Sequence, residues 1–259
     1  MRYGFAFVRV GVAVLIFAAI LGQLLLSFDI WTRTGADIAF SVVNFFSFFT
    51  IESNVASVVV LLVGAVILVA RRGDDPEWFT VMRVVVVTYM ATTGVVYNLL
   101  LRGIELPQGT TLPWSNEVLH VVGPIYLVLD WLFAPGRTPV ASRAMWWIVG
   151  FPIAWAAYTL IRGPFAVSSL TGMRWYPYPF LNPETSQNGY LSVAFYVALI
   201  AVVISLVGVG AIWISRRWDR GRPVDASAPA PAPVAAGSSA PGGATSGEPG
   251  GDASTPARR

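Results

Sequence analysis

The sequence predicts an all-α integral membrane protein, folded as a six-transmembrane-helix bundle with both termini cytoplasmic. Of the 259 residues, 55% are hydrophobic and only 12% are charged, and the mean hydropathy is +0.64. Such a chain has too little polar surface to cover a soluble globule of this size. Its apolar residues also gather in stretches that reach the length of about 20 residues a helix needs to cross a bilayer.

Six stretches have this length, and they predict the helices in order. They cover residues 5–28, 42–70, 79–101, 115–133, 143–161 and 190–215. The first stretch follows Arg2 and Arg9, as a signal peptide would, but it is long and has no small-residue cleavage site before Asp29. We therefore expect an uncleaved helix. Together the six stretches predict one transmembrane domain over residues 1–220.

The basic residues predict the orientation, because cytoplasmic flanks carry an excess of positive charge. All seventeen are arginines. With both termini inside, the expected cytoplasmic set is Arg2, Arg9, Arg71, Arg72, Arg83, Arg137, Arg143, Arg216, Arg217, Arg220 and Arg222. Only Arg33, Arg102, Arg162 and Arg174 then lie outside. Together with richness in Ala, Gly and Pro, the arginine usage indicates G+C-rich coding, as in many actinobacteria, and hence a bacterial plasma membrane.

Composition also excludes several kinds of chemistry. The chain has no cysteine, which excludes disulfides and thiolate sites. One histidine with scattered carboxylates matches no metal-ligand motif, and no glycine-rich phosphate loop occurs. We therefore expect no metal, no cofactor, no nucleotide and no nucleic-acid partner, since a net charge of +3 reflects membrane topology. Residues 221–259, rich in Ala, Pro, Gly and Ser, are expected to form a disordered cytoplasmic tail.

The only histidine, His120, is the leading functional clue, and Thr50 is its expected neighbour. If the fourth span begins near Ser115, His120 lies about 8 Å below the outer end of that span. Thr50, about eight residues into an inward-running second span, lies about 12 Å down. Ionisable groups at such depth are costly and usually functional. The two depths match, so the sequence predicts a buried Thr/His pair near the outer face.

Other polar residues converge on the same level. In the second span Asn44, Ser47, Thr50, Asn54 and Ser57 recur every three or four residues, which places them on one helical face. The third span ends there with Thr93, Tyr97, Asn98 and Arg102. Glu52 points to the opposite side of its helix, with Arg102 as a candidate partner. The simplest interpretation of the stripe is hydrogen bonding between helices, which we prefer for Ser47 and Ser57.

The same set is suited to nucleophilic catalysis. A threonine hydroxyl needs a base to take its proton, and imidazole is suited to this at neutral pH. Asn116 or Glu117 could orient the base, since both lie within one turn of His120. An amide of Asn54, Asn98 or Asn116 could stabilise an oxyanion.

The loop over residues 162–189 is long, aromatic and expected outside, with Trp175 and Tyr176 near its middle. It is either an interfacial aromatic belt, which we favour, or a lid over an outward-facing pocket.

Three separated segments resemble the androgen-induced membrane hydrolase family, which includes the androgen-dependent regulator of tissue factor pathway inhibitor. They are residues 48–52 (FFTIE), 114–116 (WSN) with His120, and 171–177 (TGMRWYP) with Phe180 and Leu181. The resemblance covers roughly residues 1–215. It implies a multi-helix membrane bundle and threonine-dependent hydrolysis of fatty acid esters of hydroxy fatty acids. By matching motif it places the nucleophile on Thr50 and the catalytic histidine on His120.

Two positions depart from the family pattern. The family often has a second histidine directly after the asparagine, where this chain has Glu117, and Pro179 stands as an insertion before Phe180. The surroundings of the base and the substrate are therefore open. Two further hypotheses remain beside lipid ester hydrolysis. One is a non-enzymatic protein that binds lipid or moves a proton or small solute through His120, Glu52 and Glu117. The other treats the polar stripe as packing alone.

Overall fold

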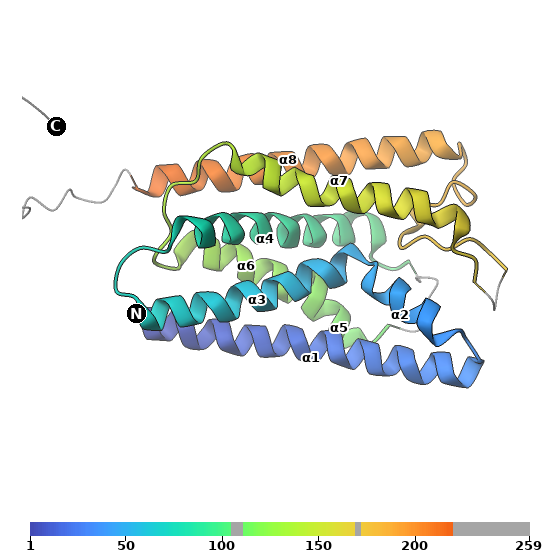
Figure 1. Cartoon of the computed structure of the whole chain (residues 1–259), viewed down its shortest axis with the longest axis horizontal. Helices are drawn as coiled ribbons and strands as arrows, with labels where there is room; N and C mark the ends of the chain where they lie inside the picture. The colour runs from blue at the N-terminus through green and yellow to red at the C-terminus, as the bar shows by residue number, and fades with distance from the viewer. Residues whose placement is uncertain (105–110, 169–171, 220–259) are drawn as a thin grey trace, which may run out of the picture. The chain divides into compact units, whose positions relative to one another are not determined.

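The computed structural model describes residues 1–104, 111–168 and 172–219 (Figure 1). The described residues are helices and loops, with one isolated antiparallel bridge between Val167 and Arg174. Five helices among them are long and apolar enough to cross a membrane: Arg2–Thr34, Phe49–Ala70, Glu77–Leu101, Ala144–Phe165 and Tyr190–Arg217. The all-helical class is therefore confirmed. The expected tail, residues 221–259, lies outside the described residues.

The helices follow the predicted order. They are α1 (Arg2–Thr34), α2 (Ile38–Phe46), α3 (Phe49–Ala70), α4 (Glu77–Val96) with the π-turn η1 (Tyr97–Leu101), α5 (Pro113–Glu117), the π-turn η2 (Val118–Val122), α6 (Gly123–Phe133), α7 (Ala144–Arg162) with the 3₁₀ turn η3 (Gly163–Phe165), the 3₁₀ turn η4 (Pro179–Leu181) and α8 (Tyr190–Asp219).

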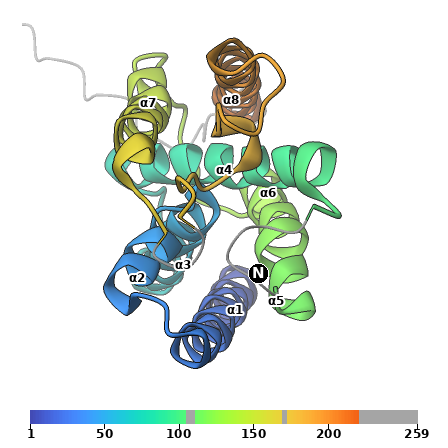
Figure 2. The same cartoon turned by 90° about the vertical axis from the view of Figure 1, so that its right-hand side faces the viewer.

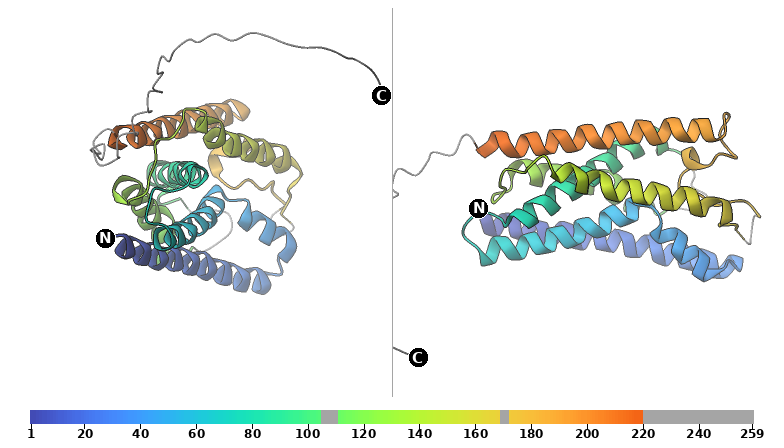
Figure 3. Two further views of the ribbon diagram at one scale, coloured as in Figure 1. Left: turned by 60° about the vertical axis from the view of Figure 1, so that its left-hand side comes forward. Right: turned by 45° about the horizontal axis from the view of Figure 1, so that its top comes forward.

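Helices α1, α7 and α8 run along a common direction, and α4 crosses the bundle obliquely between them (Figure 2). Figure 2 shows α1, α3 and the α5–α6 segment on one side of α4, and α7 and α8 on the other. If α2 is taken with α3 and α5 with α6, successive segments alternate in direction, so α1 begins at the end where α8 finishes (Figures 1 and 3). At this arginine-rich end Arg2 donates to the carbonyl of Arg71, and Arg216 to that of Val140. The opposite end, with residues 163–168 and 172–189, is the loop end.

The expected second span, residues 42–70, is broken, and this prediction was wrong. Ser47 ends α2, Phe48 is extended, and α3 begins at Phe49. Side chains of α7 hold the break: Trp155 donates to the carbonyl of Ser47 at 3.0 Å, and the Tyr158 hydroxyl lies 3.0 Å from Ser47 Oγ. Thr50 therefore lies in the first turn of a helix, not eight residues inside one.

The expected fourth span forms three consecutive helical pieces, from Pro113 to Phe133. Pro124 has no N–H, so the carbonyl of His120 cannot receive its usual helical hydrogen bond. The backbone widens into the π-turn η2 just before it, and the Asn98 side chain approaches the His120 carbonyl at 3.4 Å. π-turns are often found at functional sites.

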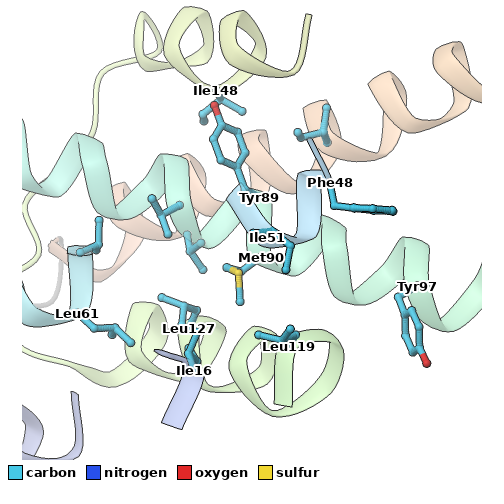
Figure 4. Packing of buried hydrophobic residues seen from close by; sticks show 14 of the residues in the cluster. Ile16, Phe48, Ile51, Leu61, Tyr89, Met90, Tyr97, Leu119, Leu127 and Ile148 are labelled. Atoms are coloured by element: carbon cyan, nitrogen blue, oxygen red, sulfur yellow. The ribbon is translucent and has the colours of Figure 1, made fainter. Parts of the chain in front are cut away.

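The core lies between α1, α3, α4 and α6. Figure 4 shows Ile16, Leu61, Met90, Leu119 and Leu127 converging there.

Toward the arginine-rich end this packing gives way to a buried ionic cluster. Arg9 donates to both carboxylate oxygens of Asp130 at 2.8 and 2.9 Å, and Arg83 joins Asp130 to Asp75. Gly64 leaves room for the Arg9 guanidinium, because a Cβ there would lie 2.6 Å from Arg9 Nη1. The cluster joins α1, α4 and α6 toward the arginine-rich end, away from the loop end.

Candidate active site

Thr50 and His120 meet at the loop end of the bundle. Thr50 Oγ1 lies 3.3 Å from His120 Nε2, although the two residues are 70 positions apart. Both are buried, with 7% and 9% of their surface exposed. The structure thus brings together the two residues that the sequence analysis singled out.

The surroundings of His120 fix its tautomer. The Nδ1 atom lies 2.9 Å from the backbone carbonyl oxygen of Asn116. A carbonyl only accepts, so Nδ1 carries the proton and the neutral ring leaves a lone pair on Nε2. That lone pair faces the Thr50 hydroxyl. This is the arrangement in which an imidazole can take the proton of a nucleophile.

Tyr97 restricts the orientation of the His120 imidazole ring by stacking on it. The two rings stack with centroids 3.9 Å apart and planes 22° apart. The Asn116 side-chain amide donates to the Tyr97 hydroxyl, and the Arg102 guanidinium lies over the outer face of Tyr97, 5.5 Å from its centroid. Tyr97 and Asn116 are therefore both at the site, where they restrict His120.

Of the two residues expected to orient the base, Asn116 does so, through its backbone carbonyl. The Asn116 side chain bonds Tyr97. Glu117 instead pairs with Arg102 at 3.1 Å, where both side chains are about half exposed.

The suggested pairing of Glu52 with Arg102 was wrong, because Arg102 bonds Glu117 and Asn98. Glu52 Oε2 is buried, and no described residue offers it a hydrogen bond. Glu52 nevertheless lies only two residues from Thr50, in the first turn of α3.

None of the three expected amides is aimed at Thr50 Oγ1. Asn54 donates to the carbonyls of Thr50 and Leu119, at 2.8 and 3.2 Å. Asn98 donates to the carbonyls of Gly94 and His120, and Asn116 donates to Tyr97. These amides hold α3, α4 and η2 together and are engaged with other acceptors.

Tyr178, which the sequence analysis did not select, approaches Thr50 from the loop. Its hydroxyl oxygen lies 3.3 Å from Thr50 Oγ1 and accepts the Thr50 backbone N–H at 3.2 Å. Burial raises the pKa of the Tyr178 phenol to about 12, so it keeps its proton near neutral pH. The available signal was its place between Pro177 and Pro179 in the aromatic run of the loop.

The two loop residues that were selected lie farther from the pair. Trp175 packs edge-on against Phe48, with ring centroids 5.6 Å apart, and so supports the start of α3. Tyr176 covers Gly163, where a Cβ would overlap its ring. These contacts hold the loop against the bundle, while Tyr178 supplies the polar group.

Thr50 and Tyr178 line an apolar cavity of about 410 Å³. Its walls come from η1, α4, α7, α8 and the turn η4, and they include Leu101, Trp155, Phe180 and Ile204. A volume of this size suits a single small ligand or acyl chain. Thr50 therefore contacts His120 on one side and lines the apolar cavity on the other.

Comparison with known proteins gives no match: no protein-family model, no curated protein and no solved structure is similar to this chain.

Proposed function

We propose that the protein is an integral membrane hydrolase that cleaves lipid esters, with Thr50 as nucleophile and His120 as general base. One observation carries the proposal: the imidazole presents its unprotonated Nε2 to Thr50 Oγ1 at 3.3 Å, beside an apolar cavity. The resemblance to the androgen-induced membrane hydrolases supports the same pair. It favours fatty acid esters of hydroxy fatty acids as the substrate class.

The reaction follows from the positions of the groups. His120 Nε2 takes the Thr50 proton as Oγ1 bonds to the ester carbonyl carbon, and the carbonyl oxygen becomes an oxyanion. When this intermediate collapses, the ester C–O bond breaks and Nε2–H protonates the leaving alcohol. Water then attacks the carbonyl carbon of acyl-Thr50 while Nε2 takes its proton, and the acid leaves as the C–Oγ1 bond breaks and Nε2–H returns the proton to Thr50 Oγ1. Each step moves one proton through one imidazole.

Tyr178 is the group we propose for the oxyanion. Its phenol accepts the Thr50 N–H and lies 3.3 Å from Oγ1, close to where the carbonyl oxygen must lie after attack. With the Thr50 proton directed to His120, the Tyr178 O–H donates to Oγ1 at rest, and it can turn from there to the developing oxyanion. Preorganised donors of this kind are usually the largest single contribution to acyl-transfer catalysis.

We further propose that six helical segments cross a bacterial plasma membrane, with the arginine-rich end in the cytoplasm. The alternating directions of the helices and the arginine bias support this. The segment from Pro113 to Phe133 is then the sixth crossing, and the site lies near the outer face. Lipid is the expected partner.

The deciding experiment labels the purified protein in detergent with a lipophilic fluorophosphonate. Wild type should react and should hydrolyse a fatty acid ester of a hydroxy fatty acid, whereas Thr50→Ala and His120→Ala should lose both properties at unchanged melting temperature. Thr92→Ala is a matched control, because Thr92 lines the same cavity and lies apart from His120. Retained turnover in either site variant would refute the assigned roles.

A second candidate function is movement of a proton or small solute, favoured by the buried carboxylate oxygen of Glu52 near the site, which has no hydrogen-bond partner in the described part of the chain. In proteoliposomes it predicts pH-dependent transport that needs His120 and Glu52 and tolerates Thr50→Ala. The hydrolase proposal predicts instead that Thr50→Ala abolishes the activity of the protein.

A further inference from the structure

The cavity at Thr50 has a wall that faces the membrane. Its lining includes residues between 149 and 156 of α7 and between 197 and 205 of α8. These two helices are neighbours on the same side of α4 (Figure 2). From the helical rise, these residues lie about 10 to 22 Å below the loop end of each helix. The cavity therefore runs alongside the hydrocarbon depth of the bilayer.

Two of these lining residues are also exposed on the outside of the bundle. Ile153 of α7 is 65% exposed, and Ala201 of α8 is exposed as well. A closed chamber cannot leave an isoleucine so accessible. The cavity thus opens sideways between α7 and α8.

The opening has a defined lower edge. At Gly208 the two helices touch closely, since a Cβ there would lie 3.1 Å from Ile148 and 3.3 Å from Met145. Ile148 is fully buried in this contact. At the loop end, Phe180 and Leu181 cover the cavity. The gap is therefore confined to the stretch between the Gly208 contact and the η4 turn.

We infer that the acyl chain of the substrate reaches Thr50 laterally from the bilayer, through the opening between α7 and α8. This inference rests on the proposed ester hydrolysis for its chemical purpose, but the binding it describes is independent of turnover. The lining is almost wholly apolar, so a chain in the membrane exchanges one apolar environment for another. Such a cavity selects a lipid by shape and places its ester at the polar end, beside Tyr178.

A water-borne route does not suit this geometry. A substrate arriving from the loop end meets Phe180, Leu181 and the buried Tyr178 before it meets the cavity. A chain from the bilayer meets only exposed apolar side chains. We therefore expect the enzyme to take esters dissolved in the membrane.

The test replaces Ala201 by tryptophan, which places an indole in the opening. Ala198→Trp is the matched control, since Ala198 is an exposed alanine of the same helix that does not line the cavity. The first readout is photolabelling in phosphatidylcholine nanodiscs with palmitic acid that carries a diazirine on its chain. We expect wild type and Ala198→Trp to be labelled on the cavity residues Ile200 or Ile204, and Ala201→Trp to lose at least tenfold of that label.

The second readout is hydrolysis by the same three proteins. For a palmitoyl ester in the nanodisc, kcat/KM should fall at least tenfold in Ala201→Trp and stay at the wild-type value in Ala198→Trp. Label confined to outward side chains such as Leu199 and Val202, or equal in all three proteins, would overturn the lateral route. Specific labelling without hydrolysis of any ester by wild type would leave the route standing and refute the hydrolase proposal.

Discussion

The hydroxyl oxygen of Tyr178 lies 3.3 Å from Oγ1 of Thr50 and accepts the backbone N–H of the same residue, across 128 positions of sequence. The loop between α7 and α8 is thus attached to the first turn of α3 at the nucleophile. Edge-on packing of Tyr178 against Phe48, with centroids 5.5 Å apart, strengthens this junction. The loop therefore takes part in the site as well as covering it.

Replacing Tyr178 by phenylalanine should lower kcat by about 100-fold and leave KM nearly unchanged, because it removes one oxyanion donor and keeps the ring. The measurement is steady-state hydrolysis of a membrane-borne ester. The raised pKa keeps the phenol protonated below about pH 10, so the pH–rate profiles of wild type and variant should have the same shape up to that pH.

Tyr158→Phe is the control for this variant. The Tyr158 hydroxyl bonds Ser47 at the α2–α3 break and does not line the cavity. We expect near-normal kcat there. Equal losses in the two variants would assign Tyr178 a packing role only.

Tyr97 is expected to act as a positioning residue through its stacking on His120. Tyr97→Leu removes the aromatic face and should lower kcat about tenfold or more, because a small displacement of a base is costly to catalysis. Tyr97→Phe keeps the stack, loses only the contact with Asn116, and should restore most of the rate. A phenylalanine variant as slow as the leucine variant would instead identify the hydroxyl as the important group.

The sequence was sufficient for the helical class and for the pairing of Thr50 with His120. Hydropathy places both residues near one end of their spans, and the only histidine directs attention to the pair. The break at Ser47 was missed because no glycine or proline marks it and the polar spacing continues through it. It is held by Trp155 and Tyr158 from a helix more than 100 residues away.

The role of Tyr178 was missed for a similar reason. An aromatic run in a loop has the same appearance whether it lies at the membrane interface or folds onto a site. Only tertiary structure brings the Tyr178 hydroxyl, and neither Trp175 nor Tyr176, to Thr50. Likewise helical spacing selected Asn116 as a neighbour of His120, but it could not show that the backbone carbonyl, and not the side-chain amide, bonds His120 Nδ1.

Asp130→Asn should destabilise the protein by about 3–5 kcal/mol, because Arg9 and Arg83 then keep buried charges with too few partners. Thermal unfolding in detergent measures the loss. Glu77→Gln is the comparison: it removes an ion pair with Arg143 in which both side chains are more than two-thirds exposed. That change should stay within about 0.5 kcal/mol. Similar losses in both variants would show that Asp130 is not the centre of the cluster.

Two glycine-to-alanine changes should have opposite signs. In Gly64→Ala the new methyl lies 2.6 Å from Arg9 Nη1 and 2.8 Å from Phe79 Cζ, both fully buried, so we expect a loss of about 1–3 kcal/mol. In Gly11→Ala it meets nothing within 4 Å, and the higher helix propensity of alanine should add up to about 1 kcal/mol. Melting temperatures of the two variants check both signs, and a stabilised Gly64→Ala would contradict the tight seat of Arg9.

Glu52→Gln should stabilise the protein by about 1 kcal/mol, since it replaces a buried carboxylate oxygen that has no hydrogen-bond partner among the described residues by a neutral amide. The matched control is Glu117→Gln, whose half-exposed carboxylate pairs with Arg102 and whose loss should change little. Ester turnover should stay close to wild type in both, because His120 takes its orientation from the Asn116 carbonyl. A large loss of turnover in Glu52→Gln at normal melting temperature would contradict this assignment and give the Glu52 carboxylate a part in moving protons at Thr50.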